Sequence, residues 1–570
     1  MEFSEHIKTA NVEDVVLTRP LHPPIKGTLC VTAHHLLFSG RDGDSPAQLL
    51  LLLRNIDAIE KSVENLVEYS GLFRRSSGPG ERAAGSSGTI TVKCKDLCVL
   101  QLDIPGMEEC LNIARSIEVL SSLDRVTEMY PFFHRPSSLS LPGRWGLSSP
   151  EEDFSLIQPL SDRWRLSQVN RDYSVCPSYP PALVVPRGVD DQTLAKAAKF
   201  RQGGRFPVLA FYHRSNGQVI MRSSQPLTGA NRKRCREDEL LLQAVIGGAE
   251  RGYIIDTRSA QLAHQARMTG GGFESKSHYH SWRRLHRNLE RGKGLQESLM
   301  KLAEACSDQS HSMDRWLSRL ENSKWLNNVN ATLSAAGLVA ECVEREGCSV
   351  LVHGYEGTDT TLLLTTLAQL ILEPRCRSLR GFLALLEREW IQVSGTPVPA
   401  ALRTVGPVPR APRLEAPSFL LLLDCVWQLG RQFPLSLGFS EALLLLLARH
   451  AYASEYGSFL CDCDRQRCAL GVKENTHCLF QFLCSPRERG RYSSPLYQPT
   501  ELAIWPSVQP QALQLWRGLF FRWTEGAQYL DEAWEEIRNL ATQGRGRGCG
   551  RSVVPMETED SVPSSRAVDC

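Results

Sequence analysis

The stretch most able to carry chemistry lies in the middle of the chain, at residues 348–361. Residues 349–352 are a short, β-prone apolar run, residues 353–358 contain two glycines, and a leucine-rich helical pattern occupies residues 359–372. A glycine-bearing loop between a strand and a helix directs several backbone N–H groups and the helix N-terminus toward one point. The sequence therefore predicts a cradle that could hold an anion such as a phosphate.

Phosphatases of the Cys-x5-Arg class place their catalytic groups on this frame. A cysteine at the end of the strand attacks phosphorus, and an arginine six residues later binds the phosphoryl oxygens through parallel N–H groups. This chain has Gly354 and Thr360 at those two positions. Glycine carries no nucleophile, and a threonine hydroxyl cannot replace a planar guanidinium. Taken alone, the loop also fits an ordinary glycine-rich turn between a strand and a helix, because Gly-x-x-Gly is common.

The loop resembles the signature of the myotubularin family of phosphoinositide 3-phosphatases, Val-His-Cys-Ser-Asp-Gly-Trp-Asp-Arg-Thr, aligned on residues 352–361. The matching positions are Val352, His353, Gly357, Asp359 and Thr361. The resemblance implies a catalytically inactive member of that family, a pseudophosphatase, in which Asp359 keeps the place of the general acid. The degenerate loop that forms the candidate site consists of His353, Gly354, Tyr355, Glu356, Gly357, Thr358, Asp359 and Thr360.

Longer matches outside the loop extend the resemblance to about residues 1–540. They include residues 164–173, 176–186, 200–209 and 222–228, which resemble the start of the family's phosphatase domain. Gly203 and Gly204 are expected to adopt positive φ angles before a buried strand. Active relatives carry two further arginines after a tryptophan that matches Trp390, and the register places those positions at Thr396 and Ala400. The resemblance therefore implies that substrate binding has been lost along with the nucleophile.

The predicted fold is a multidomain α+β and α/β arrangement. The β-rich N-terminal region ends in a helical pattern at residues 107–120 and resembles a PH-GRAM domain, a β-barrel-like module. A large α/β domain of the Cys-x5-Arg phosphatase type is expected to follow. The expected boundaries are 1–122 for the PH-GRAM domain with an inserted flexible loop at about 71–88, 123–150 for a linker, 151–528 for the inactive phosphatase domain, 529–543 for a truncated coiled-coil start and 544–570 for a disordered tail.

Charge and hydropathy narrow the range of partners. The chain has 65 Lys and Arg against 63 Asp and Glu, a net charge of +2, so no broad basic field favours nucleic acid. The N-terminal residues lack a secretory signal pattern, and the longest apolar runs, 419–423 and 442–448, are far shorter than the roughly 20 residues of a membrane span. We expect a cytoplasmic protein that is peripheral on endomembranes.

Eighteen cysteines occur in the chain, and we expect them to be reduced thiols rather than a disulfide framework. Only one cluster invites interpretation as a metal site, and its Cys-x-Cys spacing is poor for zinc. We therefore expect free thiols, no metal and no cofactor. The cluster consists of Cys461, Cys463, Cys468, His477 and Cys478.

Three functions remain open from the sequence. The resemblance implies an adaptor that binds an active myotubularin-related phosphatase as a heterodimer, or also self-associates, and supports that enzyme's stability, location or activity in phosphoinositide metabolism and membrane traffic. The alternative is a module that binds phosphoinositide membranes without a partner enzyme. The third is a weak lipid phosphatase with another nucleophile, and only the hydroxyls of Tyr355, Thr358, Thr360 and Thr361 lie nearby. Loss of a nucleophile commonly costs on the order of 10⁶ in kcat, which disfavours the third function.

Overall fold

The computed structural model describes residues 3–20, 22–41, 48–63, 87–123, 125–136, 145–307, 312–393 and 417–523. These residues all belong to one compact unit, Met1–Gly526. Several predictions fall outside the described residues: most of the inserted loop at 71–88, part of the linker, Thr396 and Ala400, the coiled-coil start and the tail.

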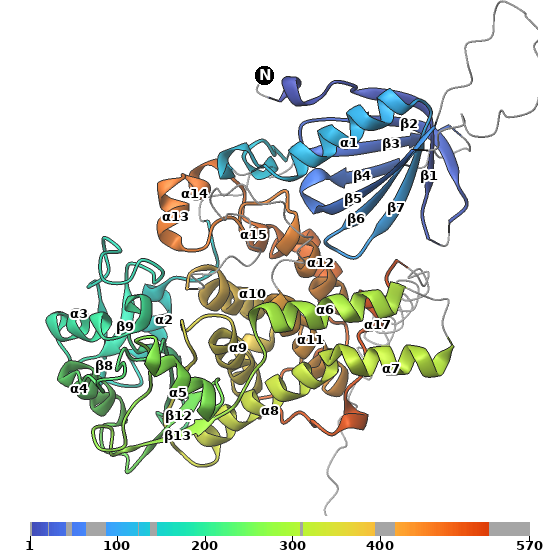
Figure 1. Cartoon of the computed structure of the whole chain (residues 1–570). Coiled ribbons are helices and arrows are strands. Elements are labelled where there is room, and N and C mark those ends of the chain that lie inside the picture. The colour runs from blue at the N-terminus through green and yellow to red at the C-terminus, as the bar shows by residue number, and fades with distance from the viewer. Residues whose placement is uncertain are drawn as a thin grey trace, which may run out of the picture. The chain divides into compact units, whose positions relative to one another are not determined.

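The N-terminal region is a seven-stranded sheet with every neighbouring pair antiparallel, and Figure 1 shows helix α1 lying across it. The strand order is β4-β3-β2-β1-β7-β6-β5. Among the described residues β4 and β5, the two end strands, do not pair with each other. The sheet of the expected barrel-like module is therefore open and does not close into a full barrel. The elements are β1 (Asn11–Thr18), β2 (Ile25–Val31), β3 (His35–Gly40), β4 (Gln48–Leu52), β5 (Ile56–Val63), β6 (Gly88–Cys94), β7 (Val99–Ile104) and α1 (Met107–Ser121).

Alternation of side chains explains why these segments form a sheet with one covered face. In β6 every second residue is buried, including Ile90 and Val92, and the same alternation runs through β2 and β7. Helix α1 buries Ile113, Ala114 and Ile117 at helical spacing against that face. The predicted helix at 107–120 is therefore confirmed within one residue.

The second region is built on a five-stranded sheet of order β10-β11-β14-β12-β13. Strands β11, β14, β12 and β13 are parallel, and β10 joins the edge antiparallel to β11. The strands are β10 (Val208–Tyr212), β11 (Val219–Ser223), β12 (Gly252–Asp256), β13 (Trp282–His286) and β14 (Val350–His353), and a separate pair is formed by β8 (Trp164–Ser167) and β9 (Leu183–Pro186). A mostly parallel sheet needs cover on both faces, which agrees with the predicted α/β class.

Helices cover both faces of this sheet. Val350 and Val352 of β14 pack into a large cluster with helices that include α8 and α9, while Leu351 between them packs into a second cluster on the other face with α4. The helices are α2 (Pro150–Ile157), α3 (Asp191–Lys199), α4 (Arg236–Ile246), α5 (Ala260–Met268), α6 (Gly292–Ser307), α7 (Met313–Ser323), α8 (Trp325–Glu344), α9 (Thr360–Leu372), α10 (Leu379–Leu386), α11 (Pro417–Gln432), α12 (Glu441–Tyr452), α13 (Asp464–Ala469), α14 (Val472–Asn475), α15 (Leu479–Leu483), α16 (Pro486–Tyr492) and α17 (Arg517–Phe520).

The predicted strand, loop and helix around residue 354 are confirmed with offsets of one residue. Strand β14 covers 350–353, and α9 begins at Thr360 because Asp359 is its N-cap, with φ 41°. The predicted positive φ angles at Gly203 and Gly204 are also confirmed, at 62° and 74°. No helix of the described residues is long and apolar enough to cross a membrane.

Candidate functional site

The candidate loop lies at the carboxyl edge of the parallel strands. His353 ends β14 and pairs in register with Ser223 of β11 and Asp256 of β12. The segments that follow these three strands therefore meet at one place, where ligands of open α/β sheets commonly bind. Of the eight predicted site residues, Glu356 is exposed, Tyr355 and Asp359 are half-buried and the others are buried.

A side chain at Gly354 would clash with a neighbouring hydroxyl group. A Cβ atom built on Gly354 would lie 2.5 Å from Thr257 Oγ1 and 3.3 Å from Thr360 Oγ1. Those two hydroxyls are hydrogen-bonded to each other at 2.8 Å, and the Thr257 N–H donates to the His353 carbonyl at 2.9 Å. A side chain at residue 354 therefore requires Thr257 to move, and Thr257 is buried and β-branched.

Gly357 is the glycine that the loop geometry demands. Its φ is 73°, and a Cβ there would lie 2.4 Å from the Ser223 carbonyl oxygen. Arg205 fixes the loop from outside by donating to the Gly357 carbonyl at 2.8 Å, and the Gln225 N–H donates to the Tyr355 carbonyl at 3.0 Å. The loop is thus held in one conformation by neighbouring segments.

His353 belongs to a buried network of charges behind the loop. Its Nε2 lies 3.0 Å from Glu274, which also receives a hydrogen bond from Arg201 at 2.7 Å. Arg201 in turn donates to both carboxylate oxygens of Asp238, at 2.8 and 2.7 Å. Burial alone would raise the pKa of Glu274, but His353 and Arg201 outweigh burial and hold that pKa well below its ordinary value. The ionised Glu274 therefore accepts a hydrogen bond from His353 Nε2–H, and the network positions the start of the loop.

Two arginines near the mouth of the loop already have partners within the chain. Arg291 lies with its guanidinium 3.9 Å from the centre of the Tyr355 ring and 3.8 Å from the Glu356 carboxylate. Arg258 lies 5.1 Å from the same ring, and it donates to both carboxylate oxygens of Asp256 at 2.8 Å. The side chains of Tyr355 and Glu356 therefore contact the basic groups that lie beside the loop.

The last loop residues lead directly into helix α9. Thr360 directs its hydroxyl to Thr257. Thr361 is fully buried, and its hydroxyl has no hydrogen-bond partner among the described residues. Asp359 caps α9 by backbone position and not through its side chain. Among the described residues, the loop presents no thiol and no guanidinium of its own.

Several residues of this site were not named from the sequence as site residues. Thr257, Glu274 and Arg201 all lie in stretches that resemble the family, so the resemblance contained a signal for their position. Their partners could not be deduced, because Arg201 and Glu274 are 73 residues apart and meet only in the folded chain. The positions Thr396 and Ala400 remain predictions outside the described residues.

The cysteine cluster has no metal-site geometry in the part of the chain that the structure describes, where no three His, Cys, Asp or Glu side chains are grouped for a metal. Burial raises the pKa of Cys461 to about 11 and raises the pKa values of Cys463 and Cys478. Cys468 is exposed and lies 3.6 Å from the Tyr173 hydroxyl. Protonated, buried thiols are poor metal ligands and poor nucleophiles.

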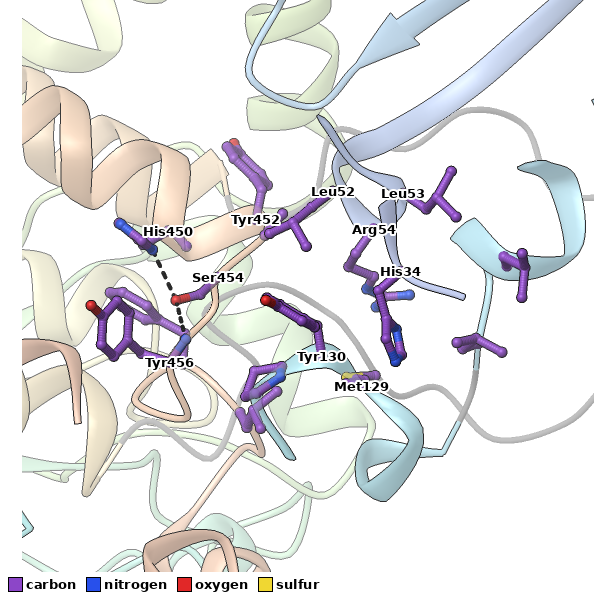
Figure 2. Close-up of a pocket in the computed structure, with 17 residues that line it drawn as sticks. His34, Leu52, Leu53, Arg54, Met129, Tyr130, His450, Tyr452, Ser454 and Tyr456 are labelled. Carbon is purple, nitrogen blue, oxygen red and sulfur yellow. Dashed lines mark hydrogen bonds between the residues drawn. The ribbon is translucent and has the colours of Figure 1, made fainter. Parts of the chain in front are cut away.

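A separate pocket lies where the N-terminal region meets helix α12, and Figure 2 shows His34, Tyr130 and His450 around it. Its volume is about 50 Å³, which has room for only a few water molecules and not for an organic ligand. The Ser454 hydroxyl accepts from the Tyr456 N–H at 3.0 Å and is therefore free to donate to His450 Nδ1 at 2.9 Å, as drawn in Figure 2. This pocket is a packed contact between two regions of the chain.

Comparisons with known proteins agree with this architecture. Residues 129–468 match the family described as "Myotubularin-like phosphatase domain". The chain is 50% identical to "Myotubularin-related protein 9" of Homo sapiens over 570 residues, which cover 99% of this chain and 100% of that protein. It is 34% identical to the protein of the same name from Caenorhabditis elegans, over 99% of this chain and 100% of that protein.

A relative named as an enzyme also matches. The chain is 32% identical to "Phosphatidylinositol-3-phosphate phosphatase MTMR7" of Homo sapiens, over 94% of this chain and 80% of that protein. Both the family match and the whole-length matches cover the sheet, the loop after β14 and the helices around them. The chain therefore belongs to the myotubularin family and is similar over its whole length to the myotubularin-related protein 9 subgroup.

Proposed function

We propose that this chain is a catalytically inactive myotubularin, a pseudophosphatase, that acts as an adaptor or regulatory subunit of an active myotubularin-related phosphatase. The observation that carries the proposal is the closed position at Gly354. The family signature has its nucleophile there, and in this chain the hydrogen-bonded pair Thr257 and Thr360 occupies the space into which a side chain would extend.

The chemistry of the loop supports inactivity. An aspartate at residue 359 can assist a leaving group only while a nucleophile attacks, and the aliphatic hydroxyls of the nearby threonines are far weaker nucleophiles than a thiolate. Arg258 and Arg291 are already engaged with Asp256, Tyr355 and Glu356. The combined loss of a nucleophile and a phosphate clamp exceeds what a substitute hydroxyl could restore.

The N-terminal region is proposed to be a PH-GRAM domain that places the complex on phosphoinositide-containing endomembranes. Its antiparallel sheet with one terminal helix supports that assignment. A role in phosphoinositide metabolism and membrane traffic would then come from the bound active enzyme, whose stability, location or activity the pseudophosphatase supports.

Purification of the tagged full-length chain from cells tests the pairing. We expect an active myotubularin-related phosphatase to co-purify in a stoichiometric ratio. Recovery of the chain alone, together with its direct binding to vesicles that contain phosphatidylinositol 3-phosphate, would favour the alternative function, a lipid-binding module without a partner enzyme.

The same purification tests where the pairing surface lies. The heptad pattern after residue 528 covers only about one and a half repeats, which is too short for a stable coiled coil. We therefore expect deletion of residues 541–570 to leave the amount of co-purifying enzyme nearly unchanged. Loss of the enzyme from that deletion would show that the tail is the pairing surface.

A further inference from the structure

A groove with a volume of about 170 Å³ lies where helix α2 meets strands β9 and β10. Strand β9 packs beside β10, and α2 lies against β9, as Figure 1 shows for α2 and β9. Residues 373–376, just after helix α9, complete the lining together with side chains that follow α10. The lining contains no residue of the loop after β14, so the groove is separate from the candidate site.

The walls of the groove are mostly apolar. Leu156 and Leu160, at and just after the end of α2, are 49% and 48% exposed beside it. Strand β9 contributes Leu183, and β10 contributes Leu209 and Phe211. An apolar group bound in the groove would remove the two exposed leucine side chains from water, which is favourable.

The volume limits the size of a ligand. An apolar cavity of roughly 150 Å³ engineered into a protein core binds benzene. Pockets for drug-sized ligands are larger, at about 300–1,000 Å³. The groove, at about 170 Å³, therefore has room for one six-membered ring or for a branched hydrocarbon chain of similar size.

Two arginines of the lining have carboxylate partners within the chain. Arg388 is paired with Asp153 at 3.2 Å, and Arg222 of β11 is paired with Glu389 at 2.9 Å. The side chains of Arg222 and Glu389 are almost fully buried. These two arginines are therefore neutralised by the protein itself and supply no free charge for a ligand.

Two further arginines lie at the rim of the groove. Arg214 and Arg375 are exposed and form no ion pair among the described residues. The lining adds one more carboxylate, Glu373, which accepts a hydrogen bond from the Arg375 backbone N–H at 3.2 Å. Two arginines against one glutamate leave a net charge of +1, and a guanidinium binds a carboxylate through charge-assisted hydrogen bonds.

We infer that this groove binds a small carboxylate with an apolar body, such as an arylacetate or a branched alkanoate of the same size. The apolar body lies against Leu156 and Leu160, and the carboxylate lies at Arg375 or Arg214. A neutral compound would leave the rim arginines unused, and an inorganic anion would leave the apolar walls in water. The inference does not depend on the proposed adaptor function, because the groove shares no residue with the loop after β14.

Titration of the full-length protein with 4-fluorophenylacetate, followed by fluorine NMR of the compound, tests the inference. For a compound of about eleven heavy atoms we expect a Kd on the order of 1 mM. The neutral analogue 2-(4-fluorophenyl)ethanol should bind at least fivefold more weakly, because it lacks the carboxylate. Acetate at the same concentration should not displace 4-fluorophenylacetate, because it lacks the apolar body.

Replacement of rim and wall side chains locates the site. Arg214→Gln combined with Arg375→Gln should weaken binding of 4-fluorophenylacetate at least fivefold, and Leu156→Gln should weaken it at least threefold. The matched controls are Arg380→Gln, at an exposed position of α10, and Leu502→Gln, where the side chain is 76% exposed. Both control positions lie outside the groove lining, so these variants should change the Kd less than 1.5-fold.

Four results would overturn the inference. They are the absence of saturable binding up to about 10 mM, equal affinities for the acid and its neutral analogue, displacement by acetate, and unchanged binding to the rim and wall variants.

Discussion

At the scale of single residues, the proposed inactivity depends on the space around Gly354. Replacement of Gly354 by Ala forces a Cβ against Thr257 Oγ1, and overpacking of this kind typically costs about 1–3 kcal/mol. Gly337→Ala in α8 is the matched control, because a Cβ there meets nothing within 4 Å and alanine is favoured over glycine in a helix by about 1 kcal/mol. We expect Gly354→Ala to lower the thermal transition temperature and Gly337→Ala to raise it.

Removal of the Thr257 hydroxyl tests whether the clash with Oγ1 causes the loss of stability. Thr257→Ala in the Gly354→Ala background should recover part of the lost stability, since the clash is with Oγ1. Equal transition temperatures for Gly354→Ala and the unmodified protein would show that the position is not closed.

Restoration of the two signature residues is not expected to restore phosphatase activity. Gly354→Cys and Thr360→Arg together supply the thiol and guanidinium, but Thr257 still crowds residue 354 and the resemblance places Thr396 and Ala400 at two further arginine positions. We expect kcat/KM on phosphatidylinositol 3-phosphate to stay far below that of an active relative measured beside it. A double variant that approached the relative's kcat/KM would contradict the view that substrate binding has decayed.

At the scale of elements, the sequence predicted what depends on local pattern and missed what depends on contact between distant segments. The helical spacing in α1 and α9 is local, so those two helices were predicted to within one residue. The strand order of the N-terminal sheet depends on the pairing of β1 with β7, which are far apart in the chain. The hydrogen bonds of Glu274 with Arg201 and His353 also join residues that are far apart in the chain.

Helices α8 and α11 are joined by a buried carboxylate, and ionisation of this carboxylate lowers the free energy of unfolding. Asp424 accepts hydrogen bonds from Trp325 Nε1 at 2.7 Å and from Gln428 at 3.0 Å, and burial raises its pKa to about 6. Because the folded state binds this proton more tightly than the unfolded state, the free energy of unfolding falls as pH rises from about 4 to about 6, and the loss is complete by pH 8.

Asp424→Asn removes that titration. We expect the variant to have a free energy of unfolding about 1–2 kcal/mol higher than that of the unmodified protein at pH 8, seen as a higher thermal transition temperature. At pH 4 we expect no difference, because Asp424 is already protonated there. The measurement at pH 4 serves as the control for changed packing. A gain that is equal at both pH values, or a loss at pH 8, would show that charge on Asp424 is not the cause.

At the scale of the whole molecule, the contact between the N-terminal region and α12 contains several histidines around one carboxylate. His35 and His134 each form a ring contact with Tyr130, and Glu455 lies 3.4 Å from His450 Nδ1. Burial lowers the pKa values of His34 and His450 to about 4, and it also lowers those of His35 and His134 despite the charge of Glu455. The neighbouring cations Arg449 and Arg135 act in the same direction as burial.

These neutral histidines make the contact acid-sensitive. A histidine whose folded pKa is depressed stabilises the fold fully above its unfolded value near 6.5, and that stability is lost as pH falls toward 4. We expect amide hydrogen exchange at residues 126–134, corrected for intrinsic rates, to increase between pH 7 and pH 5. His450→Gln keeps an acceptor for Ser454 but cannot be protonated, so it should reduce this increase. An increase that is the same in His450→Gln would exclude His450 as a source.

A turnover assay of the purified full-length protein tests the proposed inactivity directly. Its substrates are phosphatidylinositol 3-phosphate and its 3,5-bisphosphate, and Asp359→Asn is measured in parallel. We expect no phosphate release above a protein-free control from either preparation, because Gly354 and Thr360 supply neither a nucleophile nor a phosphate clamp. Release by the unmodified protein that Asp359→Asn abolishes would contradict the account and identify an active phosphatase with a different nucleophile.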